Sequence, residues 1–175
     1  QTDEGQYDRP EFILSGCGAA VAYRREALER VGFLDNSFYF SCEDVDLGWR
    51  LYLAGWRVLY HPDAVIYHKL KASSSAIASY YDKRNQLYLI WKNYPAGLLR
   101  KHWPVVLGQQ LGLTREALVH WRGAAARASL RGQLAGVFGY FRMLPARRKI
   151  MSGRRLSDES LMELLTPVDE AVRDG

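Results

Sequence analysis

The sequence predicts an α/β protein in which a mixed N-terminal region is followed by a mostly helical one. Short β-branched and aromatic runs lie before residue 70, apolar residues recur at helical spacing from about residue 76, and the charge changes sign along the chain. With 175 residues, 48% of them hydrophobic and 13% aromatic, the chain is long enough to bury one ordinary core.

The N-terminal region alternates short strands and short helices. One helix is expected over 25–31, stopped by Gly32, and a second opens at Ser41 and stops at Gly55. Pro62-Asp63 predicts a turn between the last two apolar runs. Four strands are predicted from β-branched, aromatic and small-residue content, over 12–14, 19–23, 56–60 and 64–68.

The C-terminal region is predicted to be helical over about 76–94, 99–111 and 114–144, with a short last helix capped by Ser157. Residues 99–155 carry twelve Lys or Arg and a single acid, Glu116, whereas the rest of the chain has eighteen acids against twelve basic residues. In the expected helix over 114–144, arginines lie mostly off an apolar stripe formed by Ala117, Leu118, Trp121, Ala125, Ala128, Leu134, Phe138 and Phe141.

A basic amphipathic segment of this kind favours a membrane surface as its partner. No stretch reaches the roughly 18 uninterrupted apolar residues that a bilayer span needs, so a helix lying in the interface is expected. Nucleic acid also attracts basic proteins, but the arginines are interleaved with apolar residues and no nucleic-acid motif occurs, so no nucleic-acid partner is predicted. Cys17 and Cys42 form no disulfide framework, which favours a reducing compartment.

Three acids at the start of the second expected helix are the candidate chemistry. Glu43, Asp44 and Asp46 lie within four residues, and the free N–H groups of a helix start stabilise carboxylates, so Asp44 is placed to accept a proton from an alcohol. A structural interpretation competes with this one. Ser41 and Asp44 fit a capping box, and Asp46 forms an i,i+4 pair with Arg50.

The order of several motifs resembles the second half of family 2 inverting glycosyltransferases, most closely the bacterial rhamnosyl- and galactofuranosyl-transferase branch. These motifs are Ser-Gly-Cys-Gly-Ala-Ala at 15–20, the run 24–35 ending in Gly-Phe-Leu-Asp, Phe-Tyr-Phe at 38–40, Glu-Asp-Val-Asp-Leu at 43–47, Arg50 and Gly55. The resemblance implies that residues 1–95 are the C-terminal, acceptor-side part of a GT-A (nucleotide-diphospho-sugar transferase) domain. A basic, membrane-associating helical region over 96–155 and a short helix and tail over 156–175 would follow.

The same resemblance implies roles for particular residues. Asp44 takes the position of the general base, and Glu43 would face the acceptor. His68 stands where family members place a ligand of a divalent metal, Mg²⁺ or Mn²⁺, although a lone histidine at a strand end is also a common surface residue. Other expected substrate contacts, each with a plain structural alternative, are Gly16 (or a turn), Trp49 (or the core), and Lys69 and Lys71 (or solvated lysines).

The implied partners are a nucleotide-diphosphate sugar donor, a glycan or lipid-linked acceptor, and the cytoplasmic face of a bacterial inner membrane. Nothing before Glu11 provides the nucleotide-binding half with its aspartate motif, so the 175 residues are expected to be part of a longer enzyme and inactive alone. The alternative function is a membrane-surface binding module without catalysis.

Overall fold

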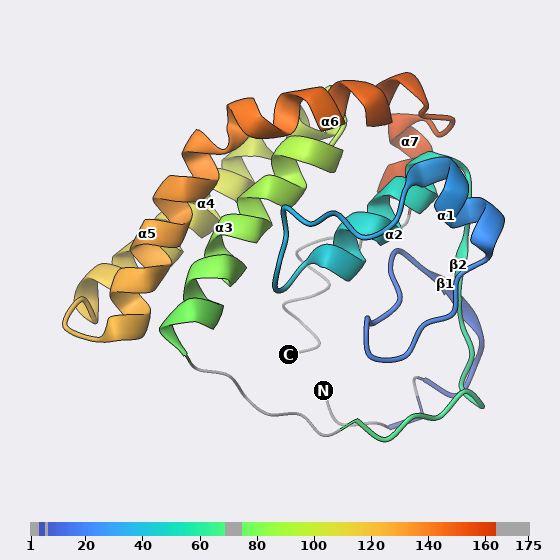
Figure 1. Ribbon diagram of the computed structural model, residues 1–175, viewed down its shortest axis with the longest axis horizontal. Coiled ribbons are helices and arrows are strands. Elements are labelled where there is room, and N and C mark those ends of the chain that lie inside the picture. The colour runs from blue at the N-terminus through green and yellow to red at the C-terminus, as the bar shows by residue number, and fades with distance from the viewer. Residues whose placement is uncertain (1–3, 6, 69–74, 164–175) are drawn as a thin grey trace.

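The computed structural model describes residues 4–5, 7–68 and 75–163. Figure 1 shows a helical layer beside a smaller region that holds the strands and two short helices. The smaller region contains β1 (Glu11–Ile13), α1 (Arg25–Val31), α2 (Glu43–Leu53) and β2 (Val58–Tyr60). The helical layer contains α3 (Ala76–Asn93), α4 (Ala96–Val119), α5 (Ala124–Phe138), α6 (Tyr140–Ser152) and α7 (Asp158–Met162).

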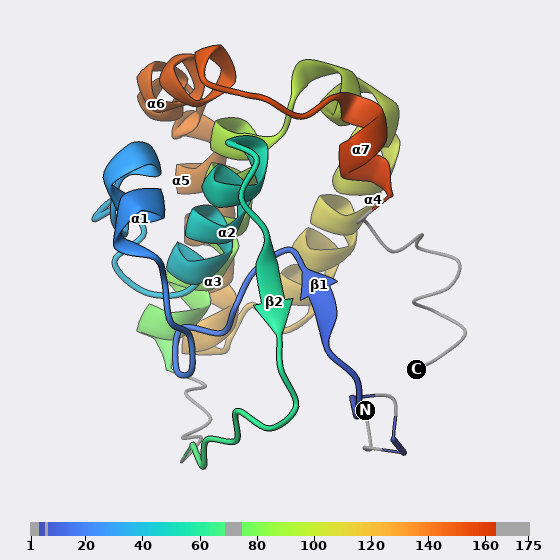
Figure 2. The same ribbon diagram turned by 90° about the vertical axis from the view of Figure 1, so that its right-hand side faces the viewer.

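The sheet is a single antiparallel pair, which Figure 2 shows in front of α2. Its register places Phe12 opposite Leu59, and the guanidinium of Arg57 lies 4.8 Å from the centre of the Phe12 ring. The strands predicted over 19–23 and 64–68 are wrong. A strand needs a hydrogen-bonded neighbour, and in the described part of the chain β1 and β2 pair only with each other. The described residues are therefore mostly helical rather than a layered α/β sheet.

Helix α2 is the centre of the N-terminal core. Trp49 and Leu53, both about 1% exposed, pack with Leu98 of α4 and Leu161 of α7. A Cβ on Gly48 would lie 2.7 Å from the carbonyl oxygen of Leu14, so the missing side chain lets α2 approach the segment after β1. The helix therefore lies at a fixed distance from the loop that follows β1.

The start of α2 differs from the expected capping box. Its first turn is preceded by Cys42 in a left-handed conformation, with φ 67°, and no side chain caps the helix. Ser41 also has a positive φ, of 67°. This unusual loop is held from α3, because the Asn85 amide donates to the carbonyl oxygens of residues 38, 40 and 41 at 2.6–2.8 Å. Tertiary hydrogen bonds have replaced the local cap.

The helical layer has more breaks between its helices over 114–144 than the sequence predicts. The expected helix over 114–144 is interrupted at residues 120–123, where α4 turns back into α5, and a single residue, Gly139, separates α5 from α6. Small residues of α5 make its contact with α3. A Cβ on Gly132 would lie 2.3 Å from the backbone oxygen of Tyr80, and one on Gly136 would lie 2.7 Å from the Leu87 side chain.

The predicted apolar stripe is not buried as one surface. Ala128 is buried against α3 and Ala117 is buried on α4, whereas Leu134, Phe138 and Phe141 remain exposed. The helices expected over 25–31, 76–94 and after Ser157 are confirmed, and the Ser157 hydroxyl accepts from the Ser160 N–H at 3.2 Å. No helix among the described residues is long and apolar enough to cross a bilayer.

Candidate functional site

Asp44 lies in the first turn of α2, facing the loop after β1. Its Oδ2 accepts a hydrogen bond from the Gly18 N–H at 2.8 Å, and its Oδ1 accepts from the Val45 N–H at 2.7 Å. The Ser15 hydroxyl donates to the Asp44 backbone oxygen at 2.9 Å, which ties the loop to the helix start. Each carboxylate oxygen can accept a second hydrogen bond, and the side chain is only partly buried. Asp44 is therefore oriented but still accessible.

Asp46, two residues further on, is completely buried and fully engaged. Its Oδ2 accepts from Arg50 Nε and from Lys92 Nζ, both at 2.8 Å, and its Oδ1 accepts from Asn93 Nδ2 at 2.7 Å. The predicted Asp46–Arg50 pair is confirmed. These bonds join α2 to the C-terminal end of α3. Because Asp46 is also completely buried, its role is structural and substrate has no access to it.

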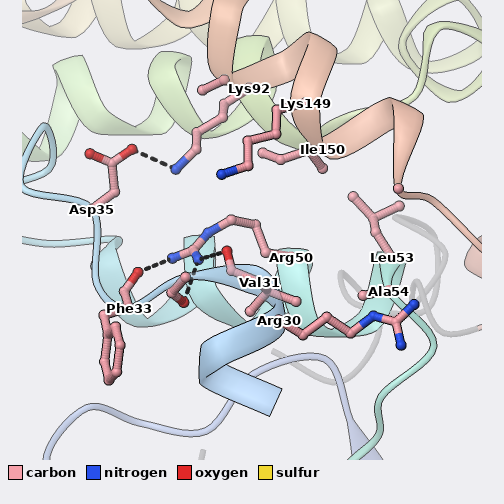
Figure 3. Close-up of a pocket in the computed structure, with 13 residues that line it drawn as sticks. Arg30, Val31, Phe33, Asp35, Arg50, Leu53, Ala54, Lys92, Lys149 and Ile150 are labelled. Atoms are coloured by element: carbon pink, nitrogen blue, oxygen red, sulfur yellow. Dashed lines mark hydrogen bonds and ion pairs between the residues drawn. The ribbon is translucent and has the colours of Figure 1, made fainter. Parts of the chain in front are cut away.

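Arg50 extends the same network to the segment after α1. Its guanidinium donates to the carbonyl oxygens of Val31, Gly32 and Phe33 at 2.8–2.9 Å (Figure 3). These carbonyls lie at the end of α1, where helix carbonyls lack intrahelical partners. The network therefore fixes the chain direction as it leaves α1.

Asp35 is the second carboxylate on Lys92. Lys92 Nζ donates to Asp35 Oδ2 at 2.7 Å (Figure 3). The Ser37 N–H donates to Asp35 Oδ1 at 2.8 Å. Burial raises the pKa of Asp35, but the hydrogen bonds from Lys92 and Ser37 and the charge of Lys92 outweigh it, so the net pKa lies below its usual value. Asp35 is therefore a second anchor of the loop before α2.

A pocket of about 360 Å³ opens between the segment after α1, α2, α3 and α6. Figure 3 shows Lys92 and Lys149 reaching into it, with Leu53 and Ile150 on its apolar side. At 100° per residue, Leu53 projects from the side of α2 opposite Asp44, and at the other end of the helix. This pocket is thus separate from the candidate base.

Two buried polar atoms near Asp44 lack partners among the described residues. They are Oε2 of Glu43 and the hydroxyl of Tyr23. Burial raises the pKa of Tyr23, and the negative charge of Asp44 raises it further. Buried polar atoms normally find a hydrogen-bond partner, so an unpaired carboxylate oxygen next to Asp44 is suited to a hydroxyl donor. Tyr23 gave no signal in the sequence, because a lone tyrosine after a glycine-rich loop has no distinguishing pattern.

Two of the predicted substrate contacts have other positions. Trp49 is a core residue whose ring lies 4.8 Å from that of Tyr94, which matches the structural alternative given for it above. Gly16 is buried, and a Cβ there would lie 2.6 Å from the Val21 side chain. It is Gly18, which the sequence did not distinguish from Gly16, that meets Asp44.

The remaining predicted residues lie on or beyond an extended segment after β2. His68 is exposed, and Lys69 and Lys71 lie outside the described residues. Within the part of the chain that the structure describes, no group of three or more His, Cys, Asp or Glu side chains is arranged to hold a metal ion. His68 supplies one ligand at most, so these residues do not complete a metal site.

The geometry around Asp44 lies in a segment that matches a known family. Residues 2–86, just under half of the chain, match the family model described as glycosyltransferase like family 2. This segment is family 2 glycosyltransferase sequence, as its motifs predict, and it is similar to rhamnosyltransferases.

Two curated relatives share this similarity, both from Mycobacterium tuberculosis, strains CDC 1551 / Oshkosh and ATCC 25618 / H37Rv. Each is named N-acetylglucosaminyl-diphospho-decaprenol L-rhamnosyltransferase and is 40% identical to this chain over 74 residues. The match covers 42% of this chain and 24% of each relative, so the chain spans about a quarter of the relatives' length. No solved structure matches the chain.

Proposed function

We propose that residues 1–95 are the acceptor side of an inverting glycosyltransferase in which Asp44 is the general base. The observation that carries this proposal is the contrast among the three acids of α2. Asp46 is buried and neutralised by Lys92 and Arg50, whereas Asp44 is held by the Gly18 and Val45 N–H groups with acceptor positions to spare. A base must be both oriented and accessible.

The reaction needs one displacement at the anomeric carbon of the donor sugar. The acceptor oxygen attacks that carbon and forms the new glycosidic bond, while the bond to the diphosphate oxygen breaks and its electron pair leaves with the nucleoside diphosphate. The acceptor proton passes to a carboxylate oxygen of Asp44. Because the oxygen attacks from the side opposite the leaving group, the anomeric configuration is inverted, and a single carboxylate is sufficient.

Glu43 is proposed to bind the acceptor. Its Oε2 is buried and has no hydrogen-bond partner within the described residues, so an acceptor hydroxyl would satisfy it. The relatives' names specify a lipid-linked sugar acceptor, and a lipid-linked glycan is the acceptor class we propose for this chain. We place the reaction at the cytoplasmic face of a bacterial plasma membrane, where such an acceptor is accessible to a nucleotide sugar.

Donor binding is proposed to reside mainly in sequence outside these 175 residues. The chain matches only 24% of each relative, and the pocket beside Arg50 lies away from Asp44. Family 2 enzymes generally use a divalent metal, and His68 would be one of its ligands, completed by carboxylates of the nucleotide-binding part. Lys69 and Lys71 would contact the diphosphate.

The test is an activity assay of the full-length protein with Asp44→Asn. The assay supplies a nucleotide-activated L-rhamnose and N-acetylglucosaminyl-diphospho-polyprenol, and it measures labelled sugar in the lipid fraction. Loss of a general base lowers kcat by about 10²–10⁴-fold. Asp63→Asn is the matched control, because the Asp63 side chain is 89% exposed and should leave kcat unchanged. Asp44→Asn activity within twofold of wild type would exclude Asp44 as the base.

Glu43→Gln separates acceptor binding from proton transfer. The amide keeps the size of the side chain but loses the charge that strengthens a hydrogen bond from a hydroxyl. We expect a higher acceptor KM with a smaller change in kcat. A fall in kcat equal to that of Asp44→Asn, at unchanged KM, would assign Glu43 to the chemistry instead.

A membrane-surface module without catalysis is the second candidate function. Its support is the set of apolar side chains that α4, α5 and α6 leave exposed, including Leu134, Phe138 and Phe141. It predicts that Asp44→Asn changes nothing measurable, whereas the glycosyltransferase proposal predicts a large loss of transfer.

A further inference from the structure

Large apolar side chains line the outer surface of the helical layer. Six of them are 44% to 73% exposed, whereas Leu, Val and Phe are most often buried in folded proteins. We define the outer face by these six residues: Leu107 and Leu111 of α4, Leu134, Val137 and Phe138 of α5, and Phe141 of α6.

The α5 and α6 members of the outer face share one side of a nearly continuous helix. Their spacing of three, one and three residues keeps them on one stripe, on the side of α5 opposite Gly132 and Gly136, which meet α3. Gly139, between the two helices, has helical backbone angles of φ −65° and ψ −11°, so the chain stays helical through the junction. The stripe therefore faces away from the protein core.

The α4 members lie beside this stripe. Residues 120–123 turn the chain back from α4 into α5, which makes the two helices antiparallel. Gln133 of α5 donates to the Gln110 carbonyl oxygen at 3.1 Å and accepts from the Thr114 hydroxyl at 3.2 Å, which holds the helices side by side. Gln110 and Thr114 of α4 point toward α5. In this antiparallel arrangement, Leu107 and Leu111 therefore lie on the same side of the helix pair as the α5 stripe. Both helices therefore contribute to one surface, on the side of the α4–α5 pair away from α3 (Figure 1).

Exposed arginines border the outer face. Arg115 continues the i,i+4 row of Leu107 and Leu111, and Arg142 continues the row of Leu134 and Phe138. Arg131, also exposed, lies one turn before Leu134. Residues 99–155 as a whole carry twelve basic residues and one acid. An apolar surface with a basic border complements a bilayer whose headgroups are anionic.

We infer that the outer face docks the protein on an anionic lipid bilayer, with α4 and α5 parallel to the membrane plane. The six apolar side chains would enter the boundary between headgroups and acyl chains, and the three arginines would contact lipid phosphates. A second copy of the chain is a poorer occupant, because a symmetric pair would bring the same arginines together. This inference goes beyond the proposed glycosyl transfer and does not depend on it.

The experiment is flotation of the full-length protein with vesicles of neutral phosphatidylcholine, alone or with 30% phosphatidylglycerol. Wild type should float with the anionic vesicles. The double variant Phe138→Ser/Phe141→Ser should lose at least tenfold in affinity, since it removes two aromatic side chains that are 73% exposed in the free protein. The control Phe33→Ser, at a position 65% exposed on another surface, should bind as wild type does.

A charge variant tests the arginine border separately. Arg131→Gln/Arg142→Gln should weaken binding to the anionic vesicles by about fivefold for each arginine, with little change on neutral ones. Asp44→Asn should float as wild type does, so failure of the glycosyltransferase proposal would leave this one standing.

Three outcomes would overturn the docking inference. The first is no binding of wild type to anionic vesicles. The second is unchanged binding by Phe138→Ser/Phe141→Ser with the wild-type circular dichroism spectrum. The third is a soluble oligomer that the double variant converts to monomer, because the outer face would then be a protein interface.

Discussion

Two carboxylates on opposite sides of α2 differ in burial and in hydrogen-bond partners. Asp46 faces α3, is completely buried and accepts from Arg50, Lys92 and Asn93. Asp44 faces the loop after β1 and is partly exposed, and its partners among the described residues are two backbone N–H groups. The two residues are two positions apart, so they project from nearly opposite sides of α2.

The difference shows that an acid cluster need not have one function. Desolvation makes a buried carboxylate depend on its cations, and those cations then occupy its lone pairs. A carboxylate held by backbone amides at a helix start stays charged without blocking access to solvent. Glu43 matches neither of them, because its Oε2 is buried but has no hydrogen-bond partner among the described residues.

The largest expected effect on stability is that of Asp46→Asn. The amide leaves the buried Arg50 without its counter-charge and leaves Lys92 with Asp35 alone. Removing one partner of a buried pair costs about 3–5 kcal/mol in the free energy of unfolding. Asp44→Asn keeps an acceptor for the Gly18 N–H and should cost less than about 1 kcal/mol. Urea unfolding of both variants in the full-length protein measures the two losses in the free energy of unfolding. Equal losses would contradict the different roles assigned to Asp46 and Asp44.

A smaller effect is expected for Gly48→Ala, which presses α2 away from the loop that Asp44 faces. The new Cβ would lie 2.5 Å from Ser15 Cβ and 2.7 Å from the Leu14 oxygen, and overpacking of this kind costs about 1–3 kcal/mol. Gly108→Ala in α4 is the matched control, because among the described residues its Cβ would meet nothing within 4 Å outside the backbone of its own helix and its chain neighbours.

The control should be neutral or stabilising by up to about 1 kcal/mol, since alanine favours helix over glycine. Thermal unfolding compares the two variants. If Gly48→Ala proved as stable as Gly108→Ala, the loop after β1 would not be packed against α2 as described.

A more local change is expected for Gly18→Ala. Its Cβ would lie 3.3 Å from Asp44 Oδ2, a tight contact with the side chain rather than with backbone. The N–H that holds Asp44 remains, so the free energy of unfolding should change by less than about 0.5 kcal/mol. We expect a several-fold fall in kcat from a displaced carboxylate, measured in the same transfer assay. A change in stability with an unchanged kcat would mean that Gly18 does not position the Asp44 carboxylate.

The smallest expected effect is a pH dependence of stability from Asp35. Its pKa is lowered in the folded protein by Lys92 and Ser37, relative to about 3.9 in the unfolded chain. The unfolded state therefore binds more protons in this range, and the contribution of Asp35 is present above about pH 4 and is lost as the pH falls through the lower folded value.

The variant Asp35→Asn isolates this contribution. Denaturant unfolding between pH 3 and 6 should show a shallower loss of stability on acidification than wild type shows. Identical pH profiles would mean that the Lys92–Asp35 ion pair does not contribute to stability and that Lys92 acts through Asp46.

Several features of the N-terminal region follow from local chemistry. The helix over 25–31 ends at Gly32, where φ is 86°, and Pro62-Asp63 forms the expected turn, closed by the Ala64 N–H to the His61 oxygen at 3.1 Å. The Asp46–Arg50 pair also follows from i,i+4 spacing. By contrast, the loop that leads into α2 is held by Asn85, more than forty residues later in the chain, and local sequence gives no sign of that contact.

The sequence by itself determined the family resemblance of residues 2–86, the positions of the acids and the basic character of residues 99–155, because these depend on residue type and order. Only the tertiary structure decided which acid is free, since the partners of Asp46 come from α3. It also decided that α5 meets α3 through Ala128, Gly132 and Gly136, and this leaves its large apolar residues outside. Periodicity shows that a helix has two sides, but close approach at small residues determines which side is buried.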